Sequence, residues 1–124
     1  MTLEKSLKMR SQAYERLNGK YLKEAQRLIS KRDYTQASEK LWGTAAEMVK
    51  AVAARKGIEL GTHPSLWDFV SQLDKEHPEL MLKKDFSYAG NLHQNFYEDW
   101  LGRDYIEEGL AIMKSFVEKL RSFD

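Results

Sequence analysis

The chain has 124 residues, 42% of them hydrophobic and 31% charged, which is typical of a folded globular protein. Twenty Lys and Arg stand against nineteen Asp and Glu, so the net charge of +1 excludes a strong overall field that would attract nucleic acids or membranes, although a local basic face is compatible with it. The absence of cysteine excludes disulfides, thiolate metal sites and a cysteine nucleophile. With no long apolar run and no signal-peptide core, we expect one cytoplasmic domain over residues 1–124 and no membrane contact.

The first sixty residues contain no proline and predict two long helices. Apolar residues recur every three or four positions over residues 3–29, which predicts the first helix. The segment KRDY interrupts this pattern, and Asp33 or Thr35 is suited to cap the second helix. That helix is expected to run to about Lys56, because Gly57 is placed to end it.

The second helix carries apolar residues on more than one face. One stripe consists of Tyr34, Ala37, Leu41, Ala45, Met48, Val49 and Val52. A second stripe combines Trp42 with the small residues Gly43, Ala46 and Ala53. Because a helix that is apolar on several faces is usually covered on several sides, we expect this helix to be central, with Gly43 and Ala46 admitting a close neighbour.

Three further helices are predicted after the loop IELGTHPS. We expect Ser65 to cap the third helix, with Asp68 as the acidic member of a capping box, and Pro78 to follow its end. The fourth helix begins between residues 79 and 84, and the fifth spans residues 104–123 after a break at Gly102. No strand pattern is visible. The sequence therefore predicts an all-α antiparallel bundle of four to five helices.

The stretch NLHQNFYEDW at residues 91–100 concentrates polar and aromatic side chains on the fourth helix. The helical spacing predicts a core stripe of Ala89, Leu92, Phe96 and Trp100. His93 and Tyr97 lie beside this stripe, and Asn95 and Glu98 lie on another face. Two interpretations of the histidine are open: it is a buried, hydrogen-bonded side chain at the margin of the core, or it transfers protons together with its neighbours.

Candidate site residues follow from these positions. The candidate catalytic residues are His93, Tyr97 and Glu98, and the candidate ligand-binding residues are Glu47, Lys50, His93, Asn95 and Arg103. Glu47 and Lys50 are three apart and either pair on a solvated helix face or place the carboxylate in a cleft. The sequence has no metal-binding HExxH or Glu-x-x-His motif and no glycine-rich nucleotide loop, so we expect no metal and no cofactor.

Two segments together resemble a known family. They are YLKEAQRLISKRDYTQASEKLWGTAAEMVKAVAARKG and the later LHQNFYEDWL, in which Ala89, Leu92, His93, Phe96, Tyr97 and Glu98 fit the pattern A-x-x-LH-x-x-F-[YH]-E. Over residues 13–120 the chain resembles the archaeal PaREP-type family. That family is similar to the higher eukaryote and prokaryote nucleotide-binding (HEPN) superfamily. The resemblance implies an HEPN-like bundle of four to five helices, often a homodimer, and leaves the activity unassigned.

The motif of RNA-cleaving HEPN proteins is incomplete in this sequence. Those proteins carry an Arg followed, after four to six residues, by a His. Here Arg55 precedes His63 with seven residues between them. Lys56 has the required spacing but lacks the guanidinium group that holds a phosphate through two hydrogen bonds. The resemblance therefore favours binding over RNA cleavage.

Three hypotheses about function follow. The first is a noncatalytic HEPN-like module that self-associates and binds a nucleotide, an RNA or a partner protein. The second is a metal-independent ribonuclease of a toxin–antitoxin or defence system, in which His93 acts with Tyr97, Glu98 and either Lys50 or Arg103. The third is a peptide-binding adaptor, because the first two helices have tetratricopeptide-like spacing; only one such hairpin is visible where at least three repeats are normally needed.

Overall fold

The computed structural model describes residues 2–123, which form five α-helices, one short 3₁₀ turn and no strand. The elements are α1 (Leu3–Ser30), α2 (Tyr34–Arg55), α3 (His63–Glu76), η1 (Pro78–Leu80), α4 (Leu82–Glu98) and α5 (Arg103–Arg121). The predicted all-α helical bundle is therefore confirmed. No helix within the described residues is both long and apolar enough to cross a membrane.

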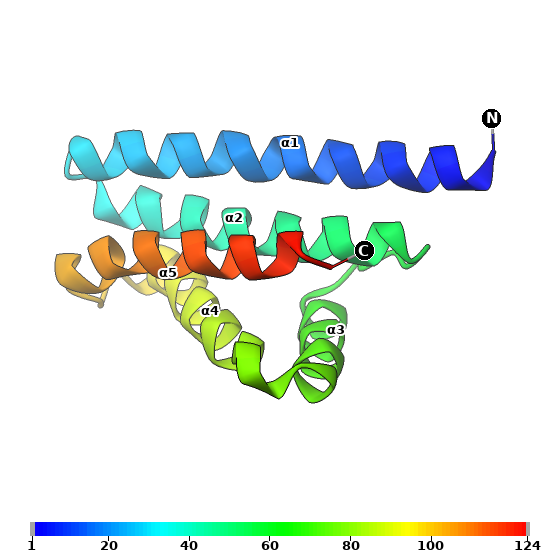
Figure 1. Cartoon of the computed structure of the whole chain (residues 1–124). Coiled ribbons are helices and arrows are strands. Elements are labelled where there is room, and N and C mark those ends of the chain that lie inside the picture. Colours follow the sequence, from blue (N-terminus) through cyan, green and yellow to red (C-terminus); the bar gives the residue numbers. More distant parts are fainter. Residues whose placement is uncertain (1, 124) are drawn as a thin grey trace.

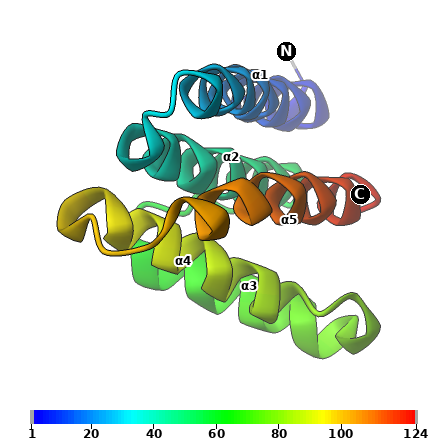
Figure 2. The same cartoon turned by 90° about the vertical axis from the view of Figure 1, so that its left-hand side faces the viewer.

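The helices stack in layers (Figures 1 and 2). Helix α1 forms one outer layer, α2 and α5 lie in the middle, and α3 and α4 cover the opposite side. The colours in Figure 1 show that α1 and α2 form an antiparallel hairpin, whereas α5 runs in the same direction as α2. Helices α3 and α4 lie below α2 in Figure 1 and bring the chain back to the end at which α2 begins. Helix α5 starts from that end and therefore runs parallel to α2.

Helix α2 is the centre of the structure, as its two apolar stripes predict. Thirteen of its 22 residues are buried, whereas only three of the 28 residues of α1 are buried. Asp33 caps α2 by accepting a hydrogen bond from the backbone N–H of Gln36, at 3.3 Å. Gly57 follows its end with a φ of +77°, a conformation that glycine adopts without steric cost. Both predicted boundaries of this helix are confirmed.

A glycine on α2 lets α1 approach closely. A Cβ atom placed on Gly43 would lie 2.8 Å from Cδ2 of Tyr21, closer than side-chain atoms tolerate. The Tyr21 ring therefore occupies the space that a side chain at position 43 would need. The sequence prediction of a close neighbour at Gly43 is confirmed.

The start of α3 differs from the prediction. Thr62, and not Ser65, is the N-cap, and its side chain accepts a hydrogen bond from the backbone N–H of Ser65 at 3.2 Å. Ser65 takes the third position of the capping box, where Asp68 was expected to act. Ser65 Oγ accepts a hydrogen bond from the Thr62 backbone N–H at 3.1 Å. A hydroxyl group therefore completes the capping box in place of a carboxylate.

The end of α4 also differs from the prediction. The helix ends at Glu98, Phe96 is half-buried, and the Trp100 side chain is 56% exposed, so the core stripe ends at Leu92. Asn95, by contrast, is fully buried. Its side-chain oxygen Oδ1 accepts hydrogen bonds from the backbone N–H groups of Trp100 and Leu101 at 2.9 and 2.7 Å. These bonds turn the chain sharply out of the helix, which carries the Trp100 side chain away from the core.

The close contact at Gly43 gives a stability prediction. We expect Gly43→Ala to lower the free energy of unfolding by about 1–3 kcal/mol, because the new methyl group overlaps the Tyr21 ring. Gly19→Ala is the matched control, since no atom lies within 4 Å of its added Cβ, and we expect it to raise the free energy of unfolding by up to about 1 kcal/mol through helix propensity. Urea unfolding measures both changes, and equal effects of the two substitutions would contradict the packing argument.

Candidate functional site

A pocket of about 360 Å³ opens beside α2, between α1 and the loop that leads into α3. Its charged lining residues are Glu39, Lys40, Glu47 and Lys50, its aromatic and imidazole lining residues are Tyr21, Trp42 and His63, and its remaining walls are Gly43, Ala46, Leu60, Gly61, Thr62 and Leu66. This volume lies within the range of small-molecule binding sites, and the mixture of apolar walls with a few polar groups is typical of them.

The α-helical register of α2 explains why the pocket lies here. Glu39, Gly43, Ala46 and Lys50 follow one another at spacings of four, three and four residues, so they share one face of the helix. Small side chains in the middle of this face leave a hollow, and charged side chains stand at both ends of it. The same face contributes Trp42, whose ring forms part of the wall.

Histidine and aromatic rings form a continuous cluster at one side of the pocket. The His93 ring stacks on Trp42 with ring centroids 4.9 Å apart, and His63 meets Trp42 edge-on at 5.3 Å. The two histidine rings are 4.9 Å apart, and Tyr97 contacts His93 edge-on at 5.4 Å. His93 Nδ1 lies 2.8 Å from Glu39 Oε1, so the carboxylate fixes the orientation of this half-buried ring.

The charged side chains of the pocket are held in pairs. Lys50 Nζ lies 3.3 Å from Glu47 Oε1, and Lys40 Nζ lies 2.8 Å from Glu24 Oε2. The hydrogen bond from Lys40 lowers the pKa of Glu24 below its usual value. The Lys40 ammonium also lies 5.1 Å from the centroid of the Tyr21 ring. The ammonium groups are therefore held at the edge of the pocket.

Glu47 has an unused acceptor atom. Its Oε2 is buried and has no hydrogen-bond partner among residues 2–123, although Oε1 binds Lys50. Buried carboxylate oxygens are almost always hydrogen-bonded, so this atom can accept a hydrogen bond from a bound molecule.

Some of the predicted site residues come together at the pocket. Glu47 and Lys50 line it, which supports the cleft interpretation of this pair over the solvated-face interpretation. His93 does not line the pocket but adjoins it through its contacts with Trp42 and Glu39, and Tyr97 lies one step further out, against His93. His93 lies half-buried at the margin of the core, a placement that both interpretations given for it from the sequence allow.

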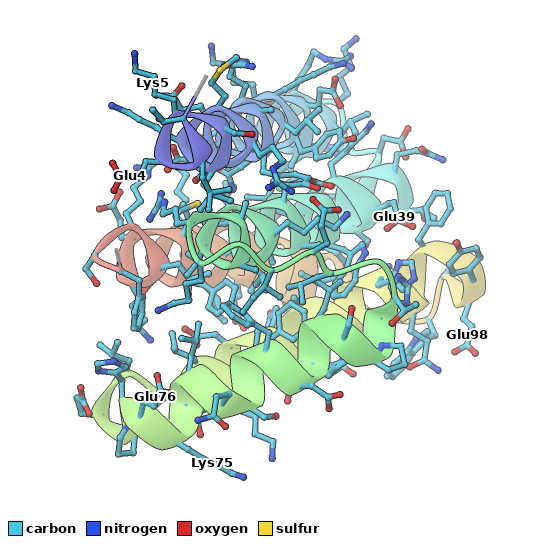
Figure 3. All side chains as sticks on the ribbon, turned by 90° about the vertical axis from the view of Figure 1, so that its right-hand side faces the viewer. Glu4, Lys5, Glu39, Lys75, Glu76 and Glu98 are labelled. Carbon is cyan, nitrogen blue, oxygen red and sulfur yellow. The ribbon has the colours of Figure 1, made fainter. Side chains whose placement is uncertain are left out.

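The other predicted site residues lie elsewhere. The Asn95 amide is buried and donates a hydrogen bond to Ser38 Oγ at 2.8 Å, so its hydrogen-bonding groups serve the end of α4. Glu98 is exposed at the outer end of α4, apart from Glu39 (Figure 3), and accepts a hydrogen bond from Gln94. Arg103 is exposed at the start of α5 and is not part of the pocket wall.

The arginine nearest in sequence to His63 serves another contact. Arg55 donates hydrogen bonds to Ser11 Oγ at 3.0 Å and to Glu15 Oε1 at 2.7 Å, and it lines a different hollow between α1 and the end of α2. His63 and Arg55 therefore do not converge. Within residues 2–123, no three His, Asp or Glu side chains come together as a metal site would require.

Sequence reasoning did not single out Trp42, His63 and Glu39 as site residues. A signal for the site was nevertheless present in the face of α2 that joins Glu39 to Lys50 through Gly43 and Ala46. Charged ends around small central residues on one helix face indicate a hollow lined by charges. The participation of His63 has no such signal, because it depends on how the loop before α3 folds back onto α2.

Comparison with known proteins establishes the family of the chain. The model of the archaeal PaREP1/PaREP8 family matches residues 13–117, so the chain belongs to this family. No curated protein and no solved structure matches the chain.

Proposed function

We propose that this member of the archaeal PaREP1/PaREP8 family is a noncatalytic, HEPN-like cytoplasmic module that self-associates and binds a nucleotide in the pocket beside α2. One observation carries the proposal. A single pocket of about 360 Å³ combines aromatic walls, two lysines and a carboxylate oxygen of Glu47 that has no hydrogen-bond partner within the described part of the chain. Aromatic rings can stack on a base, and the carboxylate oxygen can accept a hydrogen bond from its amino group. The two lysines supply cations for a phosphate.

The size of the pocket favours a nucleotide among the three partner classes that the sequence leaves open. An RNA strand or a protein surface contacts its partner over an extended area, whereas this hollow encloses one small molecule. Each charged pair around the pocket contains a carboxylate and an ammonium group. Such pairs suit a ligand that carries a hydrogen-bond donor for the carboxylate and an anionic group for the ammonium. Binding would replace part of the Lys50 interaction with Glu47 by contacts to the ligand.

The proposed self-association is supported by two exposed aromatic residues. Tyr97, near the end of α4, is 71% exposed, and Trp100, just after the helix, is 56% exposed. Large aromatic side chains of this kind are enriched in the centres of protein interfaces. We therefore place the contact between two copies of the chain at this corner of the structure.

A ribonuclease is the second candidate function, and the contact between Glu39 and His93 favours it. A carboxylate at His93 Nδ1 favours the tautomer in which Nε2 is free to act as a base. His63, with its ring 4.9 Å away, is a second group that could exchange a proton. The missing Arg in the HEPN motif and the different placement of Arg55 weigh against this candidate.

Nucleotide binding tests the leading proposal. In calorimetric titrations we expect AMP, GMP, CMP or UMP to bind the chain with a Kd of up to about 1 mM. We expect Glu47→Ala to weaken that binding by about 10- to 100-fold, because a hydrogen bond to a charged group is lost. Glu108→Ala removes an exposed carboxylate on α5 that does not line the pocket, and we expect it to bind as the parent chain does. Failure of all four nucleotides to bind, or unchanged binding by Glu47→Ala, would contradict the proposal.

Self-association is tested by sedimentation equilibrium. We expect a dimer at about 100 μM protein and a weaker dimer in a Tyr97→Ser/Trp100→Ser variant, because two interface aromatics are lost. Met9→Ser removes an exposed apolar side chain on α1 instead and should leave the dimer intact. A parent chain that is monomeric at this concentration would rule out the dimer.

RNA cleavage separates the two candidate functions. On the leading proposal, the purified chain leaves a broad panel of RNAs uncut in the presence of a metal chelator. His77 lies at the end of α3 against Phe123 and provides the control histidine. Cleavage that His93→Ala lowers by about 100-fold or more and that His77→Ala preserves would establish the ribonuclease in place of the noncatalytic module.

A further inference from the structure

The net charge of +1 conceals a separation of charge along the chain. Residues 1–32 contain nine Lys and Arg and three Glu, whereas residues 33–124 contain eleven Lys and Arg and sixteen Asp and Glu. The first segment therefore has six more positive than negative charges, and the remainder has five more negative than positive charges. Most of the first segment is α1, which forms an outer layer of the structure (Figure 2). The positive charge is therefore concentrated on one side of the molecule.

Four of these cations lie in a row on the outer face of α1. Arg16, Lys20, Lys23 and Arg27 are separated by four, three and four residues, so they share one face of the helix, and all four are exposed. We call these four residues the basic stripe. The buried residues of α1 are Ser11, Asn18 and Ala25, whose spacing of seven places them on the opposite face against α2. The basic stripe therefore faces solvent along about 16 Å of helix.

No ion pair neutralises the basic stripe: none of its four side chains forms one with any residue in the range 2–123. The acidic residues of the same part of α1 have other ion-pair partners, since Glu15 binds Arg55 at 2.7 Å and Glu24 binds Lys40 at 2.8 Å. Lys20 and Arg27 interact with the Glu24 carboxylate only more weakly than Lys40 does. In Figure 3, Lys5 also points away from α2, which extends the positive face towards the start of the helix.

We propose that the basic stripe binds the phosphate backbone of double-stranded DNA. Successive cations rise by about 4.5–6 Å along α1, and such a regular row matches a polymer with regularly spaced negative charges. Helix α1 stands as a separate layer that packs mainly on α2, so its outer face projects from the molecule (Figures 1 and 2). A projecting helix fits the major groove of B-form DNA, which is about 12 Å wide, but not the deep and narrow major groove of A-form RNA.

Other anionic partners fit this face less well. A membrane-surface helix needs an apolar face for the lipid, but the apolar face of α1 is packed on α2. Single-stranded nucleic acid is normally bound by aromatic rings that stack on its bases, and the basic stripe contains none. A protein interface has an apolar or aromatic centre, whereas the centre of this face consists of lysine and arginine.

Salt-dependent DNA binding tests the proposal. Fluorescence anisotropy with a labelled duplex of roughly 20 base pairs, two helical turns, should show binding that weakens about 100-fold between about 50 and 200 mM salt if four phosphates are contacted. We expect a variant with Arg16→Gln, Lys20→Gln, Lys23→Gln and Arg27→Gln to bind at least tenfold more weakly at about 50 mM salt and to lose most of the salt dependence. Circular dichroism confirms that the variant is folded.

A matched variant controls for net charge. Lys75→Gln, Lys83→Gln, Lys84→Gln and Lys114→Gln together remove four exposed cations from α3, α4 and α5 that form no ion pair within residues 2–123. Figure 3 places Lys75 on the side of the molecule opposite α1. We expect this variant to keep DNA binding within about twofold of the parent chain, because phosphate contacts are local. An equal loss in both variants, or no DNA binding by the parent chain, would overturn the proposal.

Competing anions complete the test. Duplex RNA, single-stranded RNA and vesicles containing anionic lipid are titrated under the same conditions, and tighter binding of any of them than of duplex DNA would overturn the choice of partner. The outcome is independent of the nucleotide pocket, because no residue of the basic stripe lines it. The basic stripe variant should therefore retain nucleotide binding, and Glu47→Ala should retain DNA binding.

Discussion

The enclosure of α2 is the constraint on which the rest of the structure depends. This helix is apolar on two faces, so it must be covered on several sides, and α1, α3, α4 and α5 all pack against it. Close coverage requires small residues where helices meet, as at Gly43 beneath the Tyr21 ring. It also requires partners for the polar groups that become buried. Asn18 of α1 meets this requirement by donating to the backbone oxygen of Thr44 at 2.6 Å.

The candidate pocket is a consequence of the same packing. The small residues that admit α1 next to α2 also leave space where α1 and the loop before α3 diverge around Trp42. Charged side chains at the edge of this space are stabilised by ion pairs, since a charge without a partner is costly in a partly enclosed site. Glu47 is paired with Lys50 through Oε1, but its Oε2 is buried without a hydrogen-bond partner among the described residues. This atom is the observation on which the proposed binding of a ligand in the pocket rests.

The outer position of α1 has a different consequence. One face of this helix is required for packing on α2, and the opposite face is free to carry charge without disturbing the core. The cations gather there, while the acidic excess lies in the remainder of the chain. The two proposed binding surfaces therefore use different faces of α1: Tyr21 lines the pocket, and the basic stripe lies on the outer face. A substitution in one surface need not affect the other.

The sequence by itself determined the helices, the central place of α2 and the family, because helical periodicity, capping residues such as Asp33 and linear motifs are local properties of a chain. For Glu47 the sequence left two interpretations open, a solvated helix face and a cleft. Only the tertiary structure decided that Asn95 is buried and Trp100 exposed, since the backbone N–H groups after α4 turn back to the Asn95 side chain. The tertiary structure likewise decided that His63, the first residue of α3, contacts the Trp42 ring of α2 and the His93 ring of α4. Such contacts join residues far apart in the chain, and their geometry depends on how whole helices pack.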